Sequence, residues 1–292
     1  MKNMDIAVIG GDRRTACMAQ MFAEKGRKVV CYGTVLEGDT KEISNTKIHR
    51  AKTLRQAVEN TPVIVCGLPL EYEGNLYLSN QLAPVATGEL QRCLRKGQKI
   101  FAGMIPEDFK KKCEERQILC YDFMKEEPLS LFQTIATAEG AIAETFLHSN
   151  RQLHHSKVLV LGYGRCAKTL AEKLTGLNAD VTVCSKDDTE LALAEALGKK
   201  ILPLSALSNN LSSFDFIYNT IPACILDRSM LPMVNPNVCI IDIASKRVGV
   251  DYEACEKHDL NAVYCPHLPG KYASGSCSKR LTDYVLKNIN SE

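Results

Sequence analysis

A glycine-rich turn in the second half of the chain constrains the fold more than any other feature. The motif GYGRCA at residues 162–167 directly follows an apolar run, 158–161, and opens a stretch with helical spacing, 165–176. In such a setting the first glycine permits a tight turn, the second lets the backbone approach a pyrophosphate, and the small alanine lets helix and strand pack closely. The helix N-terminus adds a partial positive charge that favours phosphates. The motif therefore predicts a dinucleotide-binding unit.

Short apolar runs alternate with helical stretches along the whole chain, a pattern typical of parallel sheets with helices on both faces. The expected strands of the first half are 5–9, 28–31, 62–66, 99–102 and 117–121, with helices at 15–24 and 106–116. The expected strands of the second half are 157–161, 180–184, 214–218, 238–243 and 262–264, with helices at 165–176 and 188–198. We therefore expect the α/β class, with two Rossmann-like, doubly wound parallel-sheet domains.

A long helical segment predicts how these domains are joined. The 292 residues suffice for about two domains. Within 128–149 the apolar positions 132, 135, 142 and 146 form a helical stripe that also includes Glu139. The expected organisation is an N-terminal α/β domain at 1–127, a bridging helix at 128–149, a nucleotide-binding domain at 150–275, and a C-terminal helix at 276–292 that packs back on the first domain.

Charge and cysteine content exclude several function classes. Lys and Arg number 36 against 34 Asp and Glu, so the net charge of +2 offers no electrostatic footprint for nucleic acid or a membrane surface. No apolar run approaches the roughly 18 residues of a membrane span, and the N-terminus lacks the core of a signal peptide. The 13 cysteines contain no C-x-x-C motif. We expect free thiols in a reducing cytosol and no metal site.

The end of the strand that follows the glycine motif predicts the form of the cofactor. An NAD site usually places Asp or Glu there, to accept a hydrogen bond from the ribose 2′-hydroxyl. This chain has Cys184, Ser185 and Lys186 at that place, a hydroxyl and a cation that suit a 2′-phosphate. We therefore expect NADP, although Asp187 or Asp188 in a shifted register would restore NAD.

Residues after the other strands are candidates for binding and catalysis, because ligands of open α/β sheets bind at the carboxyl ends of strands. The turn at 10–14 (GGDRR) either holds a carboxylate or exposes two solvated arginines. Lys246 is a carboxylate partner or a surface lysine, and His267 is a general base or a turn residue. Glu139 either lines a cleft or pairs with a structural cation, because an unpaired buried carboxylate is costly.

Six motifs in this order resemble the A subunit of dipicolinate synthase of spore-forming bacteria, over nearly the whole chain. They are GGDRR at 10–14, TAEGAI at 137–142, LGYGR at 161–165, NTIP at 219–222, IDIASK at 241–246 and LPG at 268–270. The chain departs from the family at Arg247 and Val248, where Pro-Gly is expected, and this puts the shape of that loop in question.

The resemblance implies an NADP-dependent dehydrogenase subunit that works with a flavoprotein-like B subunit of dipicolinate synthase in the mother-cell cytosol of a sporulating bacterium. Its implied substrate is a dihydrodipicolinate-level dicarboxylate of the lysine/diaminopimelate pathway, and its product is pyridine-2,6-dicarboxylate. A homo-oligomer is left open. The alternatives are a D-2-hydroxyacid-dehydrogenase-like reductase and a non-catalytic NADP-sensing module.

Residues and resemblance together give the expected site. The catalytic candidates are Lys246, Glu139 and His267, and the substrate-binding candidates are Arg13, Arg14, Thr137 and Ser245. The cofactor-binding candidates are Gly162, Tyr163, Gly164, Arg165, Cys166, Ser185, Lys186, Asn219, Thr220, Pro222 and Asp242. Asn219 and Thr220 are expected to flank the nicotinamide. The cations and amides would orient two carboxylates, because orientation is the larger task in this oxidation.

Overall fold

The computed structural model describes residues 4–34, 47–78 and 82–289, and the chain divides into two compact units. Unit 1 comprises Met1–Phe132 with Ala273–Glu292, and unit 2 comprises Gln133–Tyr272. Helix α5 (Glu127–His148) begins in unit 1 and ends in unit 2. Each unit contains one six-stranded parallel sheet.

The sheet of unit 1 has the strand order β3-β2-β1-β4-β7-β8. Its strands are β1 (Ile6–Ile9), β2 (Val29–Tyr32), β3 (Ile48–Arg50), β4 (Val63–Cys66), β7 (Lys99–Ala102) and β8 (Leu119–Asp122). Its helices are α1 (Arg13–Glu24), α2 (Leu54–Val58), α3 (Thr87–Cys93), α4 (Glu107–Glu115) and α10 (Ser274–Ile289), and a small hairpin joins β5 (Glu71–Tyr72) to β6 (Asn75–Leu76).

The sheet of unit 2 repeats this topology, with the order β11-β10-β9-β12-β13-β14. Its strands are β9 (Lys157–Leu161), β10 (Asp180–Ser185), β11 (Lys200–Pro203), β12 (Phe216–Asn219), β13 (Cys239–Asp242) and β14 (Asn261–Tyr264). Its further helices are α6 (Arg165–Gly176), α7 (Asp188–Ala196), α8 (Tyr252–Lys257) and α9 (Leu268–Tyr272). Both orders are the doubly wound arrangement of dinucleotide-binding folds, so the expected fold class is confirmed.

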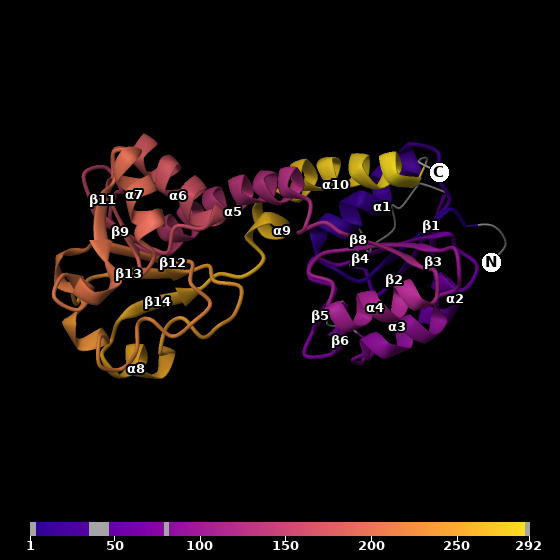
Figure 1. Ribbon diagram of the computed structural model, residues 1–292, viewed down its shortest axis with the longest axis horizontal. Helices are drawn as coiled ribbons and strands as arrows, with labels where there is room; N and C mark the ends of the chain where they lie inside the picture. Colours follow the sequence, from indigo (N-terminus) through magenta and orange to yellow (C-terminus); the bar gives the residue numbers. More distant parts are fainter. Residues whose placement is uncertain (1–3, 35–46, 79–81, 290–292) are drawn as a thin grey trace. The chain divides into compact units, whose positions relative to one another are not determined.

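Alternation along β1 explains the layers of unit 1, because successive side chains of a strand point to opposite faces. Ala7 and Ile9 pack in the core under α2, α3 and α4, whereas Ile6 and Val8 pack in the core under α1 and α10. Figure 1 shows α1 and α10 on one side of this sheet and α2, α3 and α4 on the other. Both faces are covered, so the strands read as continuous apolar runs.

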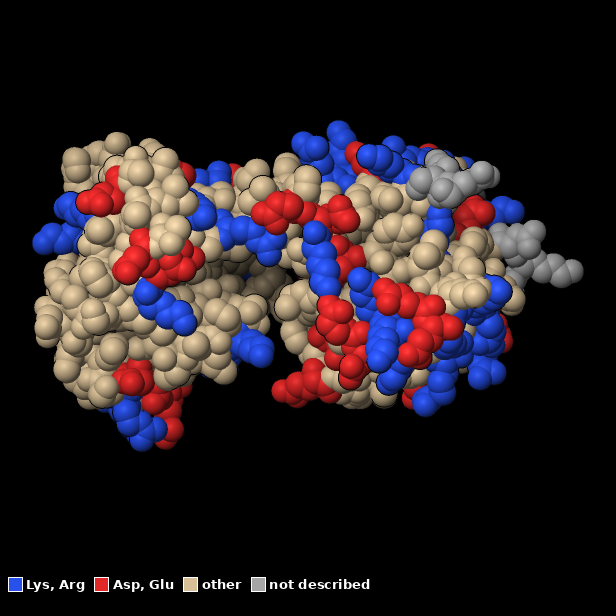
Figure 2. Space-filling model, in the orientation of Figure 1, with Lys and Arg blue, Asp and Glu red and all other residues tan. Residues whose placement is uncertain are grey.

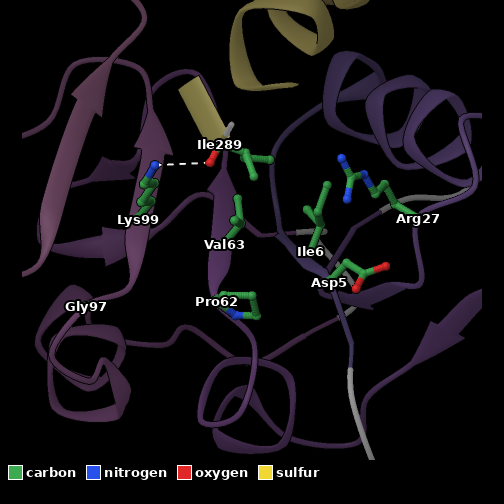
Figure 3. Close-up of a pocket in the computed structure, with 8 residues that line it drawn as sticks. All are labelled: Asp5, Ile6, Arg27, Pro62, Val63, Gly97, Lys99 and Ile289. Atoms are coloured by element: carbon green, nitrogen blue, oxygen red, sulfur yellow. Dashed lines mark hydrogen bonds between the residues drawn. The ribbon is translucent and has the colours of Figure 1, made fainter. Parts of the chain in front are cut away.

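Helix α10 is fixed to unit 1 at both of its ends. The Ser278 hydroxyl donates a hydrogen bond of 2.8 Å to the carbonyl of Arg14 on α1. At the other end, Lys99 Nζ donates to the carbonyls of Asn288 (2.7 Å) and Ile289 (3.2 Å), which suits the negative end of a helix. The pocket beside this contact lies at the amino ends of β1, β4 and β7, away from the edge where doubly wound sheets bind ligands (Figure 3).

The sequence analysis missed two strands, and one of its expectations was wrong. The edge strands β3 and β11 were missed because they are largely exposed and so lack a continuous apolar run. On α5 the expected apolar stripe is not the buried face, since Ile135 is 39% and Phe146 53% exposed, and Glu139 is exposed too. The buried face consists mainly of small residues such as Ala138 and Ala141, which let neighbouring elements approach closely.

The surface of the described residues mixes both charge signs. Around α4 in unit 1, Lys and Arg alternate with Asp and Glu in Figure 2, and Lys125 forms an ion pair with Glu107 there. No helix of the described residues is long and apolar enough to cross a membrane. The same residues contain no group of three or more His, Cys, Asp or Glu that could hold a metal. All 13 cysteines are described and are free thiols, most of them buried.

Candidate nucleotide-binding site

The loop between β9 and α6 lies at the point where the strand order of unit 2 reverses. Gly162 directly follows β9 and has φ +89°, in the left-handed region that favours glycine. A Cβ at this residue would lie 2.7 Å from Thr220 Oγ1 and 3.0 Å from Ile221 Cγ1, so the loop after β12 packs directly against it. The Thr220 hydroxyl donates to the Leu161 carbonyl at 2.8 Å and holds the two loops together. Gly162 therefore has both a conformational and a packing role.

The second glycine of the motif leaves open space at the start of α6. A Cβ built on Gly164 meets no atom within 4 Å, and Gly164 is the N-cap residue of a 12-residue helix. Within the described parts of the chain no side chain caps this helix, and its first turn contains no acidic residue. The amide groups of the first turn and the helix dipole are therefore available to an anion. This geometry fits a pyrophosphate.

Tyr163 lies between these glycines and points into the core. Its side chain is 1% exposed, and burial raises the pKa of its hydroxyl. The hydroxyl has no hydrogen-bond partner among the described residues. The Lys168 ammonium lies 5.7 Å from the ring centroid. The Tyr163 side chain thus packs in the core and fixes the loop. Any contact of Tyr163 with a cofactor would therefore be made by its backbone and not by its side chain.

The carboxyl end of β10 carries the residues predicted to choose the cofactor. Lys186 is exposed, whereas Ser185 is 3% exposed. The Ser185 hydroxyl donates to Glu190 Oε2 at 2.6 Å, and the Tyr163 amide donates to the same oxygen at 3.2 Å. Burial raises the pKa of the neighbouring Cys184 thiol to about 12. Sequence reasoning missed Glu190, because nothing in the sequence signals that it turns back to the glycine loop.

The ends of β12 and β13 form one hydrogen-bonded cluster. Asn219 Nδ2 donates to Asp242 Oδ1 at 2.9 Å and to the Ile221 carbonyl at 3.1 Å, and both Asn219 and Asp242 are fully buried. The Tyr252 hydroxyl donates to the other carboxylate oxygen of Asp242 at 2.7 Å. Burial and this contact raise the pKa of Tyr252. Asn219 and Asp242 are therefore buried residues that hold together the loops after β12 and β13. Pro222, in the first of these loops, is exposed.

The loop after β13 presents the predicted substrate-binding residues to solvent. Ser245 and Lys246 are exposed, and the Lys246 carbonyl accepts a hydrogen bond of 2.9 Å from the Val248 amide. The Arg247 guanidinium lies 4.5 Å from the centroid of the Tyr252 ring. Since Tyr252 also holds Asp242, the Arg247 that departs from the family pattern is part of what fixes this loop.

The remaining candidates of unit 2 lie on or beside α5. Lys173 Nζ on α6 donates to Glu139 Oε1 at 2.9 Å, so the structural cation expected as the alternative for Glu139 is present. The Thr137 hydroxyl donates to the Gln133 carbonyl at 3.1 Å, and burial raises the pKa of the Cys166 thiol in the first turn of α6, although Thr137 lowers it. Exposed Arg165 begins the same turn. Half-buried His267 has φ +59°, and its carbonyl accepts from the Gly270 and Lys271 amides at the start of α9.

A polar contact between α5 and α9 was not expected from the sequence. Glu144 is 3% exposed, and its carboxylate accepts a hydrogen bond from Lys271 Nζ. A Cβ on Gly140 would lie 2.8 Å from Leu268 Cβ, so the glycine allows α9 to pack against α5. Burial opposes the charged form of Glu144, but the bonds from Lys271 and Tyr272 prevail and lower the pKa of the carboxyl. His267 is thereby held at the end of a firmly packed helix.

The corresponding loop of unit 1, between β1 and α1, is filled by the chain itself. The Gly11 amide donates to the Tyr77 carbonyl at 2.6 Å. Asp12 caps α1 by accepting from the Arg14 amide at 2.9 Å, and its carboxylate forms an ion pair with the buried Arg14 guanidinium. Arg14 also donates to the Leu68 carbonyl at 2.9 Å. Arg13, the other arginine of this loop, is exposed.

Comparison with known proteins agrees with the family resemblance. Residues 5–124 match the family model for the N-terminal domain of the dipicolinate synthase A subunit. The chain is 25% identical to the A subunit of dipicolinate synthase from Bacillus subtilis (strain 168), over 98% of this chain and 96% of the relative. The crystal structure of the A subunit of dipicolinate synthase from Bacillus halodurans has a TM-score of 0.81 at 23% identity, and covers 99% of this chain and 98% of its own.

More distant solved structures share the fold. A transhydrogenase from Sinorhizobium meliloti has a TM-score of 0.61 at 14% identity, with 98% of this chain and 94% of that chain covered. An L-alanine dehydrogenase has a TM-score of 0.59 at 13% identity, with 99% and 90% covered. The resemblance carried by the six sequence motifs is therefore confirmed, and the transhydrogenase and the L-alanine dehydrogenase share the fold of this chain.

Proposed function

We propose that this relative of the dipicolinate synthase A subunit oxidises a dihydrodipicolinate-level intermediate to pyridine-2,6-dicarboxylate, with a nicotinamide dinucleotide held at the β9–α6 loop of unit 2. The observation that carries the proposal is the open start of α6, where Gly164 meets no atom within 4 Å and no side chain caps the helix. The relationship to the family supplies the reaction, and this loop supplies the place for the cofactor.

Different residues around the loop would bind different parts of the dinucleotide. The backbone of Gly162 and Gly164 and the first turn of α6, with Arg165 and Cys166, would hold the pyrophosphate. Asn219, Thr220 and Pro222, after β12, would lie beside the nicotinamide, with Asp242 fixing Asn219. Exposed Lys186 favours the 2′-phosphate of NADP, whereas the Ser185 hydroxyl, predicted to bind the same group, is buried and donates to Glu190 Oε2. When bound, the nicotinamide supplies the hydride acceptor of the reaction.

The substrate needs orientation more than a strong base. Its oxidation transfers one hydride and releases one proton, and the product gains an aromatic ring. Exposed Lys246 and Ser245 are the proposed carboxylate partners of the substrate in unit 2. In unit 1, taken by itself, exposed Arg13 is the proposed binder of a carboxylate. His267 is the proposed proton acceptor. Thr137, beside Cys166, is the proposed substrate contact on α5. Arg14 and Glu139 are engaged by Asp12 and Lys173, so their roles would be to support these groups.

The name of the family implies a second subunit, and we propose that the flavoprotein-like B subunit of dipicolinate synthase is the partner of this chain. The test uses the purified full chain, with and without the B subunit, NADP and dihydrodipicolinate generated in situ. We expect the absorbance of reduced nicotinamide at about 340 nm to rise faster than in the uncatalysed reaction. Lys246→Ala should lower kcat/KM by about tenfold or more, and the exposed lysine variant Lys257→Ala on α8 should not.

One result would refute the proposal. If the absorbance rises no faster than the uncatalysed rate even with the B subunit present, the chain is not the dehydrogenase. Reduction of a 2-keto acid with NADPH would instead support a 2-hydroxyacid-dehydrogenase-like reductase. Binding of NADPH without turnover of either substrate would support a sensing module.

A further inference from the structure

Glu190 brings a carboxylate to the edge of the sheet where the sequence lacks one. It is the third residue of α7, and its Oε2 accepts hydrogen bonds from the Ser185 hydroxyl at 2.6 Å and from the Tyr163 amide at 3.2 Å. Ser185 ends β10, and Tyr163 belongs to the glycine loop after β9. The carboxylate therefore spans the ends of two neighbouring strands, at the place where dinucleotide-binding folds hold the adenosine ribose.

The start of α7 fixes this carboxylate. Asp187 caps the helix by accepting from the amides of Thr189 (2.8 Å) and Glu190 (3.2 Å). From the fixed start of α7 the Glu190 side chain extends toward the glycine loop. Both hydrogen bonds that it accepts, from Ser185 and from Tyr163, are made to the same oxygen, Oε2. No described residue donates a hydrogen bond to the other oxygen, Oε1. A half-buried carboxylate with one free oxygen is the acceptor that a ribose hydroxyl needs.

We propose that Glu190 determines cofactor specificity, accepting the ribose 2′-hydroxyl of NAD and opposing the 2′-phosphate of NADP. The inference rests on the proposed dinucleotide site. Lys186, exposed beside it, acts in the opposite sense because its ammonium favours the phosphate. A like charge beside a bound phosphate is the repulsive element that specificity often requires. With one determinant of each kind, the chain uses both NAD and NADP instead of one alone.

Titration of the full chain with NADH and with NADPH, followed by nicotinamide fluorescence, tests the proposal without the catalysed reaction. We expect the two Kd values of the wild type to lie within about tenfold of each other. Glu190→Gln keeps the shape and removes the charge, and should shift the ratio toward NADPH by about tenfold or more. Lys186→Ala should shift the ratio toward NADH. Glu195→Gln, an exposed carboxylate on the same helix, is the matched control and should leave the ratio unchanged.

The outcomes separate this inference from the proposed function. If neither dinucleotide binds, the dinucleotide site itself is refuted and the inference fails with it. If both bind and Glu190→Gln leaves the ratio unchanged, only the role of Glu190 is overturned, as it is by a wild type that prefers NADPH by about a hundredfold. Circular dichroism checks folding. Should Glu190→Gln not fold, Glu190→Asp retracts the carboxylate by one methylene, and a shift toward NADPH in that variant supports the same role.

Discussion

The two units have the same strand order, but they differ in the loop at the point where that order reverses: the β1–α1 loop is closed by the chain itself, and the β9–α6 loop is open. In unit 1 the Gly11 amide donates to the Tyr77 carbonyl, and the Asp12 carboxylate caps α1. In unit 2 the N-cap of α6 is Gly164, which has no side-chain cap and no neighbour within 4 Å of a built Cβ. The anion site that a doubly wound fold creates is thus filled by a carboxylate of the chain in unit 1 and is open in unit 2.

This difference teaches that topology alone does not make a nucleotide site. Strand order places a helix N-terminus at the carboxyl edge of the sheet, but the residue at the N-cap decides whether an anion can use it. In unit 1 the Asp12 charge would repel a phosphate, and the Arg14 guanidinium is already paired with it. The glycines of the two loops therefore have different roles, and substitutions should separate them.

The largest expected effect is that of Gly10→Ala in unit 1. Gly10 has φ +61°, and a Cβ would lie 2.1 Å from the Tyr77 carbonyl oxygen, a backbone atom that cannot move alone. We expect the free energy of unfolding of unit 1 to fall by about 3 kcal/mol or more. Urea unfolding followed by circular dichroism, with hydrogen exchange to assign the transition to unit 1, measures it. A variant as stable as the wild type would mean that Tyr77 does not close this loop.

The sequence predicts the strands and helices that carry the two loops. It does not predict most of the contacts that make one loop closed and the other open. The strands Lys99–Ala102 and Lys157–Leu161 and the helix Arg165–Gly176 have the predicted bounds, because uninterrupted apolar runs and glycine turns mark them. Nothing local indicates that Tyr77 reaches Gly11, 66 positions earlier in the chain, or that Glu190 turns back to Tyr163. On α5, hydrophobicity predicted the wrong face because close packing selected small residues there.

A smaller effect, on binding instead of stability, is expected from Gly164→Ala in unit 2. Its φ is −72° and a Cβ meets open space, so the free energy of unfolding should change by less than about 1 kcal/mol. The added methyl group would occupy space that the pyrophosphate backbone contact requires, and the Kd for NADPH should rise about tenfold or more. Fluorescence titration and urea unfolding of the same preparation give both values. If Gly10→Ala and Gly164→Ala lowered the free energy of unfolding equally, the conclusion that the first loop is closed and the second is open would be wrong.

The smallest effect concerns the tyrosine inside the open loop. The Tyr163 hydroxyl is buried with no hydrogen-bond partner among the described residues, so Tyr163→Phe removes a group that was desolvated without compensation. We expect the free energy of unfolding to rise by about 1 kcal/mol, with little change in NADPH affinity because the Tyr163 side chain is buried in the core and the backbone of the loop is unchanged.

The matched control lies in the same unit and has a satisfied hydroxyl. The Tyr218 hydroxyl forms a 2.6 Å hydrogen bond with Thr145 Oγ1, so Tyr218→Phe should lower the free energy of unfolding by about 1 kcal/mol. The two variants remove the same atom from two buried rings, and opposite signs in urea unfolding would show that hydrogen bonding, not burial, decides the effect. If both variants lose stability, the Tyr163 hydroxyl forms a hydrogen bond in solution. The loop between β9 and α6 would then be held by one contact more than the structure describes.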